Sequence, residues 1–151
     1  DFPREGNGWS HKYARRQWNL VDNKELDYHY LGDFDREMLK VIKSEKDFNK
    51  TPVQEIWHND GDQVLAYMRG DIIFVFNFSP NRSYTDYGFI VPEGAYEVVL
   101  NTDSKDFGGN GLNDDSVTHF TNYDKLYAQD NKGWLKLYLP ARSAVVLRKK
   151  K

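Results

Sequence analysis

The hydrophobic pattern of the chain centres on the stretch QVLAYMRGDIIFVFNFSP, residues 63–80. Two short apolar runs, 64–68 and 72–78, are separated there by Arg69-Gly70-Asp71. The second run consists almost entirely of β-branched and aromatic residues, which are typical of a buried strand. A short connection that contains glycine is typical of a hairpin, because glycine adopts positive φ readily. The stretch therefore predicts two central strands of a β-core.

Further short segments after residue 52 also have the apolar–polar pattern of strands. Turn-forming sequences separate them, among them Asn59-Asp60-Gly61-Asp62 and Pro92-Glu93-Gly94. Closely spaced strands with no helical pattern between them predict a mainly β protein, an antiparallel sandwich. We expect Phe76, Trp57 and Trp134 in or near its core. The expected strands are 53–58, 64–68, 72–78, 84–90, 95–100, 117–123, 134–139 and 143–148.

Residues 1–50 have a different pattern, in which apolar residues recur at helical spacing. Helices are expected over residues 13–20 and from about residue 24 to residue 46. The second helix either ends at Gly32 and restarts with Asp33 as its N-cap, or it runs through the glycine. In both cases its apolar residues form one stripe: Leu26, Tyr30, Phe34, Met38, Val41 and Ile42.

The overall composition excludes several classes of protein. With 21 basic and 23 acidic residues the net charge is -2, so there is no basic footprint for nucleic acid. The sequence contains no cysteine, which excludes a disulfide framework and a thiolate zinc site and fits a reducing compartment. No signal peptide or membrane-spanning apolar run is recognisable. We expect a cytoplasmic protein that binds neither nucleic acid nor a membrane.

The residues capable of chemistry form no catalytic pattern. Neither an HExxH sequence nor a glycine-rich phosphate loop occurs. The acidic loop 103–115 could supply oxygen ligands to calcium. However, its spacing is not that of an EF-hand, and the positive charge of Lys105 disfavours binding of a cation. We expect no catalytic residue, no metal and no cofactor in this chain. Its histidines are scattered: His11, His29, His58 and His119.

The N-terminal loop combines aromatic residues with planar polar ones. Trp9 and Tyr13 lie close in the sequence to Asn7, Arg15 and Arg16. Sugars stack their C–H face on an aromatic ring while their hydroxyls pair with amide or guanidinium groups. Packing inside the fold is the alternative explanation for Tyr13 and for the nearby Trp18. If the chain binds sugar, Trp9 and Tyr13 are its candidate substrate-binding residues.

Two groups of motifs carry a resemblance to a known family. Residues 1–38 combine DFPR–GN, YARRQW and FDR–M in this order. The region beyond them contains FNFSP with SYTDY, then DS–FGG and LYLPAR. Together these motifs resemble 1,4-α-glucan (glycogen) branching enzymes of the α-amylase superfamily, glycoside hydrolase family 13. The resemblance covers essentially the whole chain and is greatest to the form shared by eukaryotes and some bacteria.

The resemblance implies a division into two parts. Residues 1–50 would be the helical end of a catalytic (β/α)8 barrel, and residues 51–151 the C-terminal Greek-key sandwich that packs against it. Because the chain begins with Asp1, we expect it to be a piece of a longer polypeptide. The barrel in cis would then be its partner, and part of the apolar stripe would lose its cover without it. We expect that stripe to dock partly on the chain's own sandwich and to promote self-association.

The resemblance also implies an activity, in which an α-1,4-glucan segment is transferred to a 6-hydroxyl to form an α-1,6 branch. The transfer retains configuration and therefore needs two carboxyl groups close together. In the family these acids precede the matched region, so this chain alone is expected to be inactive, with α-glucan as the substrate of its parent. Two other hypotheses stay open: a stand-alone carbohydrate-binding module, against which the helical stripe argues, and a structural or interaction sandwich unconnected with sugar.

Overall fold

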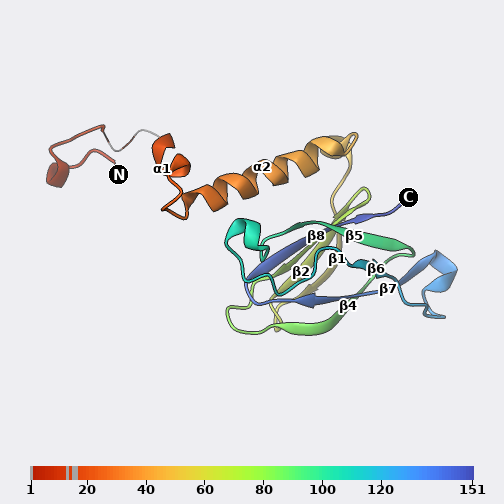
Figure 1. Cartoon of the computed structure of the whole chain (residues 1–151). Coiled ribbons are helices and arrows are strands. Elements are labelled where there is room, and N and C mark those ends of the chain that lie inside the picture. The colour runs from red at the N-terminus through yellow and green to blue at the C-terminus, as the bar shows by residue number, and fades with distance from the viewer. Residues whose placement is uncertain (1, 13, 15–16) are drawn as a thin grey trace.

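A computed structural model of the protein describes residues 2–12, 14 and 17–151. Figure 1 shows a helical N-terminal segment leading into a β-sandwich. The prediction of a mainly β, antiparallel fold is confirmed. The strands are β1 (Gln54–Asn59), β2 (Val64–Arg69), β3 (Ile72–Asn77), β4 (Tyr84–Pro92), β5 (Ala95–Asn101), β6 (Thr118–Phe120), β7 (Lys132–Leu139) and β8 (Ser143–Lys149).

The strands form two sheets. The larger has six strands in the order β1-β2-β3-β8-β5-β6, and the smaller pairs β4 with β7. The chain crosses between the sheets in the connections β3–β4, β4–β5, β6–β7 and β7–β8, which gives the Greek-key arrangement. Strands β2 and β3 form the predicted hairpin, in which Gly70 has φ 64°. Because β3 and β8 are the two middle strands of the larger sheet, the hairpin does lie at the centre of the fold.

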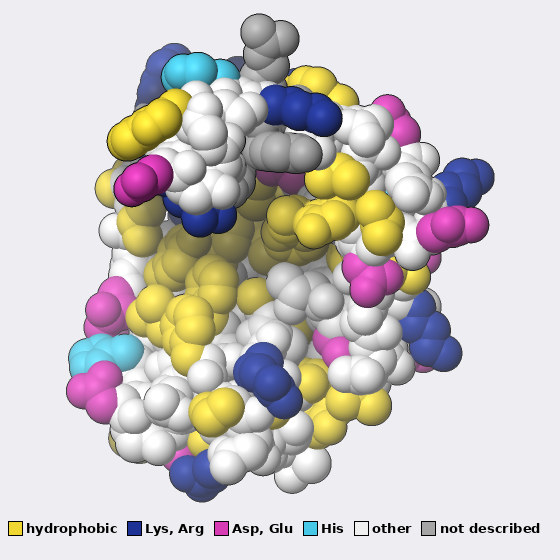
Figure 2. Space-filling view, turned by 90° about the vertical axis from the view of Figure 1, so that its left-hand side faces the viewer, with side chains coloured by type: hydrophobic (Ala, Val, Ile, Leu, Met, Phe, Trp, Pro, Cys, Tyr) yellow, Lys and Arg dark blue, Asp and Glu magenta, His cyan; other side chains and the backbone are white. Residues whose placement is uncertain are grey.

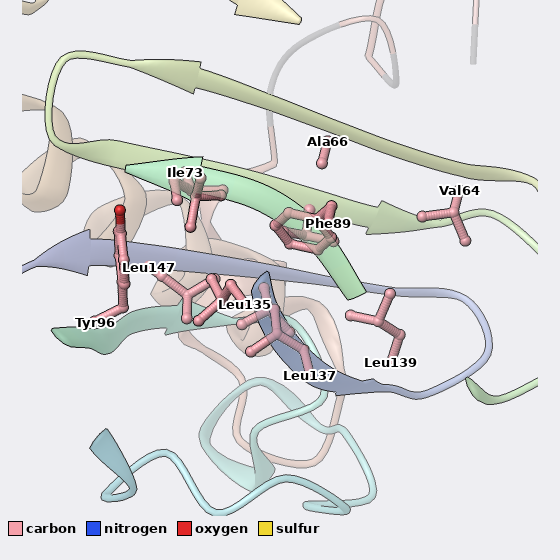
Figure 3. Packing of buried hydrophobic residues seen from close by; sticks show 12 residues of the cluster. Val64, Ala66, Ile73, Phe89, Tyr96, Leu135, Leu137, Leu139 and Leu147 are labelled. Carbon is pink, nitrogen blue, oxygen red and sulfur yellow. The ribbon is translucent and has the colours of Figure 1, made fainter. Parts of the chain in front are cut away.

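The main core lies between the two sheets (Figure 3). In β3 the side chains of Ile73 and Val75 belong to this core. Those of Phe74 and Phe76, which alternate with them along the strand, lie on the outer face of the sheet. Phe76 is therefore only half-buried, and its prediction as a core residue is wrong. The reason is the two-residue period of a strand, which sends alternate side chains to opposite faces. The fully buried core side chains include Phe89, Tyr96, Leu135, Leu139 and Leu147.

Asn77 closes one end of this core with hydrogen bonds. Its Nδ2 lies 2.8 Å from the carbonyl oxygen of Arg82 and 3.1 and 3.0 Å from those of Leu139 and Pro140. Its Oδ1 accepts from the backbone N–H of Ser79 at 3.0 Å. A buried amide needs such partners, because leaving it unpaired costs about 1–3 kcal/mol. The asparagine of the FNFSP motif thus ties β3 to the end of β7.

The helical segment contains α1 (Trp18–Asp22) and α2 (Tyr28–Ser44). Gly32 lies inside α2, so the helix runs through it and Asp33 is not a cap. A Cβ on Gly32 would lie 3.1 Å from Cγ1 of Val21, and the glycine therefore lets α1 pack closely on α2. The expected helix over residues 13–20 falls partly outside the described residues. Short 3-10 helices occupy Glu5–Asn7, Phe48–Lys50, Lys105–Phe107 and Ala128–Asp130.

The predicted apolar stripe docks in part on the outer face of the larger sheet, as expected, while its first residue, Leu26, precedes α2. The stripe packs with the side chains of a second buried cluster, and the rings of Phe34 and Phe107 meet edge to face at 5.4 Å. At the C-terminal end of the helix, Arg148 of β8 donates to Glu45 Oε1 at 2.8 Å and to Ser44 Oγ at 2.7 Å. The contact consists of Phe34, Met38 and Val41 against Ile72, Leu100 and Val146.

Arg69, like Arg148, holds the junction between the helical segment and the sandwich. Arg69 donates through Nε to the carbonyl oxygen of Thr51 at 2.8 Å and through Nη2 to that of Asn49 at 3.0 Å. Its guanidinium also lies 4.5 Å from the ring centre of Phe48. The polar sequence between α2 and β1 is therefore fixed against β2.

Candidate functional surfaces

The N-terminal candidate residues are only partly described. Trp9 follows the 3-10 helix Glu5–Asn7 and is 67% exposed, with φ 58°. Figure 1 shows this part of the chain extending away from the sandwich. Tyr13 lies outside the described residues. The structure thus presents the indole of Trp9 open to a ligand, and the role of Trp9 and Tyr13 in binding a sugar stays a prediction.

An apolar surface is much more extensive. Figure 2 shows hydrophobic side chains gathered in a hollow between the helical segment and the sandwich. Between α2 and the loop after β5, Tyr30, Leu31, Phe34 and Phe107 line a depression of about 540 Å³. Leu31 is 71% exposed there, although Phe34 and Met38 of the same helix pack on the sheet. Exposed apolar patches of this kind are typical of surfaces that contact other protein.

A row of stacked aromatic rings continues this surface over β2 and β3. The ring of Tyr67 lies 4.7 Å from that of Phe74 and 5.8 Å from that of Phe76, with interplanar angles of 17° and 19°. Phe76 stacks on Phe78 at 5.5 Å, and Phe78 is 59% exposed. The stacked rings thus form a continuous aromatic row that ends in the exposed Phe78. The alternation of aromatic residues at 74, 76 and 78 is the sequence signal that would have predicted this row.

The loop after β5 is organised around a buried carboxylate. Asp103 accepts from the backbone N–H of Asn110 at 3.0 Å and from that of Leu112 at 2.7 Å. A Cβ on Gly109 would lie 2.3 Å from the backbone of Asp103, so only glycine fits at this approach. The DS–FGG motif therefore builds the loop itself. Within the described residues no three His, Asp or Glu side chains are grouped as metal ligands.

The histidines lie in separate environments. Nδ1 of His58 lies 2.6 Å from Glu55 Oε1, and this hydrogen bond raises the pKa of His58. Nδ1 of His29 lies 2.7 Å from the carbonyl oxygen of Leu26. His119 is half-buried at β6, and burial lowers its pKa. Within the described residues, none of these three has the nucleophile and orienting acid that catalysis of acyl transfer requires.

The lowered pKa of His119 predicts a specific pH dependence. Below its ordinary pKa of 6.5 the unfolded chain takes up a proton that the folded protein resists, so His119 contributes a loss of stability as the pH falls. His119→Gln should therefore show a smaller decrease in the free energy of unfolding between pH 7 and pH 5. Urea unfolding at both pH values measures it, with His11→Gln as the control at an exposed position. An unchanged decrease in His119→Gln would contradict the assignment.

The described helices include none that is long and apolar enough to cross a membrane.

Comparison with known proteins tests the resemblance found in the motifs. The chain is 40% identical over 148 residues to a 1,4-alpha-glucan-branching enzyme of Saccharomyces cerevisiae, which covers 97% of this chain and 21% of the relative. It is 44% identical over 124 residues to a chloroplastic/amyloplastic 1,4-alpha-glucan-branching enzyme of Oryza sativa subsp. japonica, covering 80% of this chain and 15% of the relative. The resemblance is confirmed, and the chain spans about a fifth of the length of the yeast relative.

A family model assigns the sandwich independently. Residues 56–150 match the family described as "Alpha amylase, C-terminal all-beta domain". The match begins inside β1 and ends just after β8, so it contains the pairs of strands that enclose the core. The match covers more than half of the chain and coincides with the fold observed. The chain therefore belongs to the family of alpha-amylase C-terminal all-beta domains.

Proposed function

We propose that this chain is the non-catalytic C-terminal part of a 1,4-α-glucan branching enzyme. The whole enzyme transfers an α-1,4-glucan segment to a 6-hydroxyl and makes α-1,6 branches during glycogen biosynthesis in the cytoplasm. The observation that carries the proposal is the 40% identity to a branching enzyme over 97% of this chain. The α-glucan is the substrate of the whole enzyme, and Trp9 and Tyr13 are proposed to contact it.

The requirements of retaining glycosyl transfer favour a non-catalytic role for this part of the enzyme. Retaining transfer needs a nucleophilic carboxylate and an acid/base carboxyl group about 5 Å apart across the bond that is cut. The most buried described carboxylate, Asp103, already accepts two backbone hydrogen bonds inside its loop. Asp114 likewise accepts from the N–H and hydroxyl of Ser116. We therefore assign the catalytic carboxyl groups to another part of the enzyme.

We further propose that the catalytic barrel covers the apolar surface in cis. On this view residues 1–50 are the helical end of the barrel and residues 51–151 are the sandwich domain. The exposed Leu31 and Phe78 are large apolar side chains, and they suit close packing against protein better than contact with a hydrated ligand. Arg69 would fix the angle between the two parts, because it binds the carbonyl groups of the junction.

Branching assays test the proposed function directly. The purified 151-residue chain should form no α-1,6 bonds in amylose, while the longer protein that contains it should do so. Linkage analysis of the product, together with the iodine stain, measures both. New α-1,6 bonds made by the 151-residue chain would contradict its non-catalytic role. Their absence from the product of the longer protein would contradict the branching function.

A further inference from the structure

An exposed tryptophan lies at the edge of the sandwich, where the sequence predicted a core residue. Trp57 of β1 is 38% exposed. The pairing of β1 with β2 shifts register between Glu55 and Trp57, and this irregularity changes the direction of the side chains that follow. Since Trp57 lies opposite the buried Ala66, its indole extends from the core side of the sheet toward the open edge beside β4.

A chain of hydrogen bonds holds this indole in place. Nε1–H of Trp57 donates to the hydroxyl of Tyr87 at 3.2 Å, and that hydroxyl donates to Oδ2 of Asp62 at 3.0 Å. The hydroxyl of Tyr84 donates to the backbone carbonyl of Asp62 at 2.9 Å. Burial raises the pKa of Tyr87, so its hydroxyl stays protonated and keeps donating. The indole N–H of Trp57 is thus already paired within the protein. The part of Trp57 that is accessible to a ligand is the apolar surface of its ring.

Polar groups surround the same spot. Arg82 lies 5.1 Å from the ring centre of Tyr84, and its Nη2 lies 3.8 Å from Oδ1 of Asp62. The Arg82 side chain is 60% exposed and that of Asp62 30%, so both also face solvent. One positive and one negative charge cancel, and the surface carries guanidinium donors and carboxylate acceptors without net charge. This combination suits a neutral ligand with many hydroxyl groups.

The backbone on both sides of the spot is irregular. Strand β4 has its own register shift between Tyr84 and Tyr87, and Asp86 within it has φ 51°. Gln63, next to Asp62, has φ 57°. Positive φ at residues other than glycine is unfavourable, and such positions gather where a fold positions side chains for function. Two irregular strands therefore bring Trp57 and the two tyrosines to one place.

We propose that Trp57, Tyr84, Tyr87, Asp62 and Arg82 form a surface site for a chain of α-glucan. The open ring of Trp57 stacks against the C–H face of one glucose unit, and Arg82 and Asp62 pair with the hydroxyl groups of the neighbouring unit. The choice of α-glucan rests on the proposed function. The site is separate from Trp9 and holds the polymer without reacting with it.

Titration of the 151-residue chain with maltoheptaose, followed by NMR, tests this site. The indole Nε1–H resonance of Trp57 should shift with a millimolar Kd. Trp57→Ala should weaken the binding seen at the resonances of Tyr84 and Arg82 by about tenfold, equivalent to about 1.4 kcal/mol. Trp57→Phe keeps an aromatic ring and should weaken it less. Phe120→Ala is the matched control, because Phe120 is an exposed aromatic residue of β6, at the opposite edge of the larger sheet from β1, and it should leave the Kd at the Trp57 resonance unchanged.

Two results would overturn the site. The first is a Trp57 resonance that does not shift, whether or not residues near Trp9 respond. The second is unchanged affinity in both Trp57 variants, since the indole would then only close the edge of the sandwich. Thermal unfolding of Trp57→Phe checks that the fold is retained. The titration needs no branching activity, so a failure of this site is distinguishable from a failure of the longer protein to make α-1,6 bonds.

Discussion

Phe89→Ala should lower the free energy of unfolding by about 3–5 kcal/mol, which is a large part of the roughly 5–15 kcal/mol of a typical domain. Phe89 lies in β4 with 0% exposure and belongs to the core between the two sheets. Figure 3 shows its ring among side chains from both sheets. Truncation therefore leaves a cavity that close-packed neighbours fill only in part. Urea unfolding of the variant and the wild type measures the difference.

Phe76→Ala is the matched control, because it removes the same side chain from the neighbouring sheet. Phe76 is half-buried on the outer face, so its loss should cost only about 1–2 kcal/mol. The pair of variants compares the core between the two sheets with the outer face of the larger sheet. Equal costs for the two substitutions, or a greater cost for Phe76→Ala, would contradict the assignment of the inner face as the main core.

Deletion of residues 1–50 should make the sandwich self-associate more strongly. In the intact chain, Phe34, Met38 and Val41 of α2 cover the outer cluster of the larger sheet. The deletion uncovers that cluster, and each large apolar side chain left exposed costs about 1.5–3 kcal/mol relative to full burial. Sedimentation velocity of residues 1–151 and residues 51–151 at matched concentrations measures the association. The sequence alone suggested the reverse, with the helical stripe as the cause.

A substitution within the full chain separates the two explanations. Met38→Asp places a charge in the contact between α2 and the sheet without removing any residue. If the uncovered sheet causes association, this variant should associate more than the wild type. Val53→Asp, at an exposed position outside that contact, is the control. A shorter chain that stays monomeric while the full chain associates would show that the helical stripe is responsible.

The strands were predictable because their signal is local. The apolar runs on either side of Gly70 and the turn residues after β1 and β4 specify the strands and where they reverse. β6 is shorter than predicted, because Asn122 leaves it to bridge to Trp134 of β7 in the smaller sheet. Gly32 lies within a helix for a similar reason: contact with Val21 makes its small size useful there. In both places a tertiary contact decides between options that the local sequence leaves open.

The candidate sites divide in the same way. Sequence motifs identified the family, and aromatic content near Trp9 suggested sugar binding, since both depend on residue type and order alone. The exposure of Trp57 was not predictable, because it follows from a register shift in β1 and from tyrosines about 30 residues away in β4. Likewise, the composition of the run 72–78 does not say which of its two faces the second sheet covers.

By itself, then, the sequence determined the family, the antiparallel strands and the helical stripe, because these are properties of local order and spacing. Only the tertiary structure decided that the outer face of the larger sheet is the one α2 covers, and that Phe76 lies on this face. It also decided that Trp57 stands at the open edge beside Tyr87. The physical reason is that burial depends on which elements meet in space, and those contacts join residues far apart in the chain.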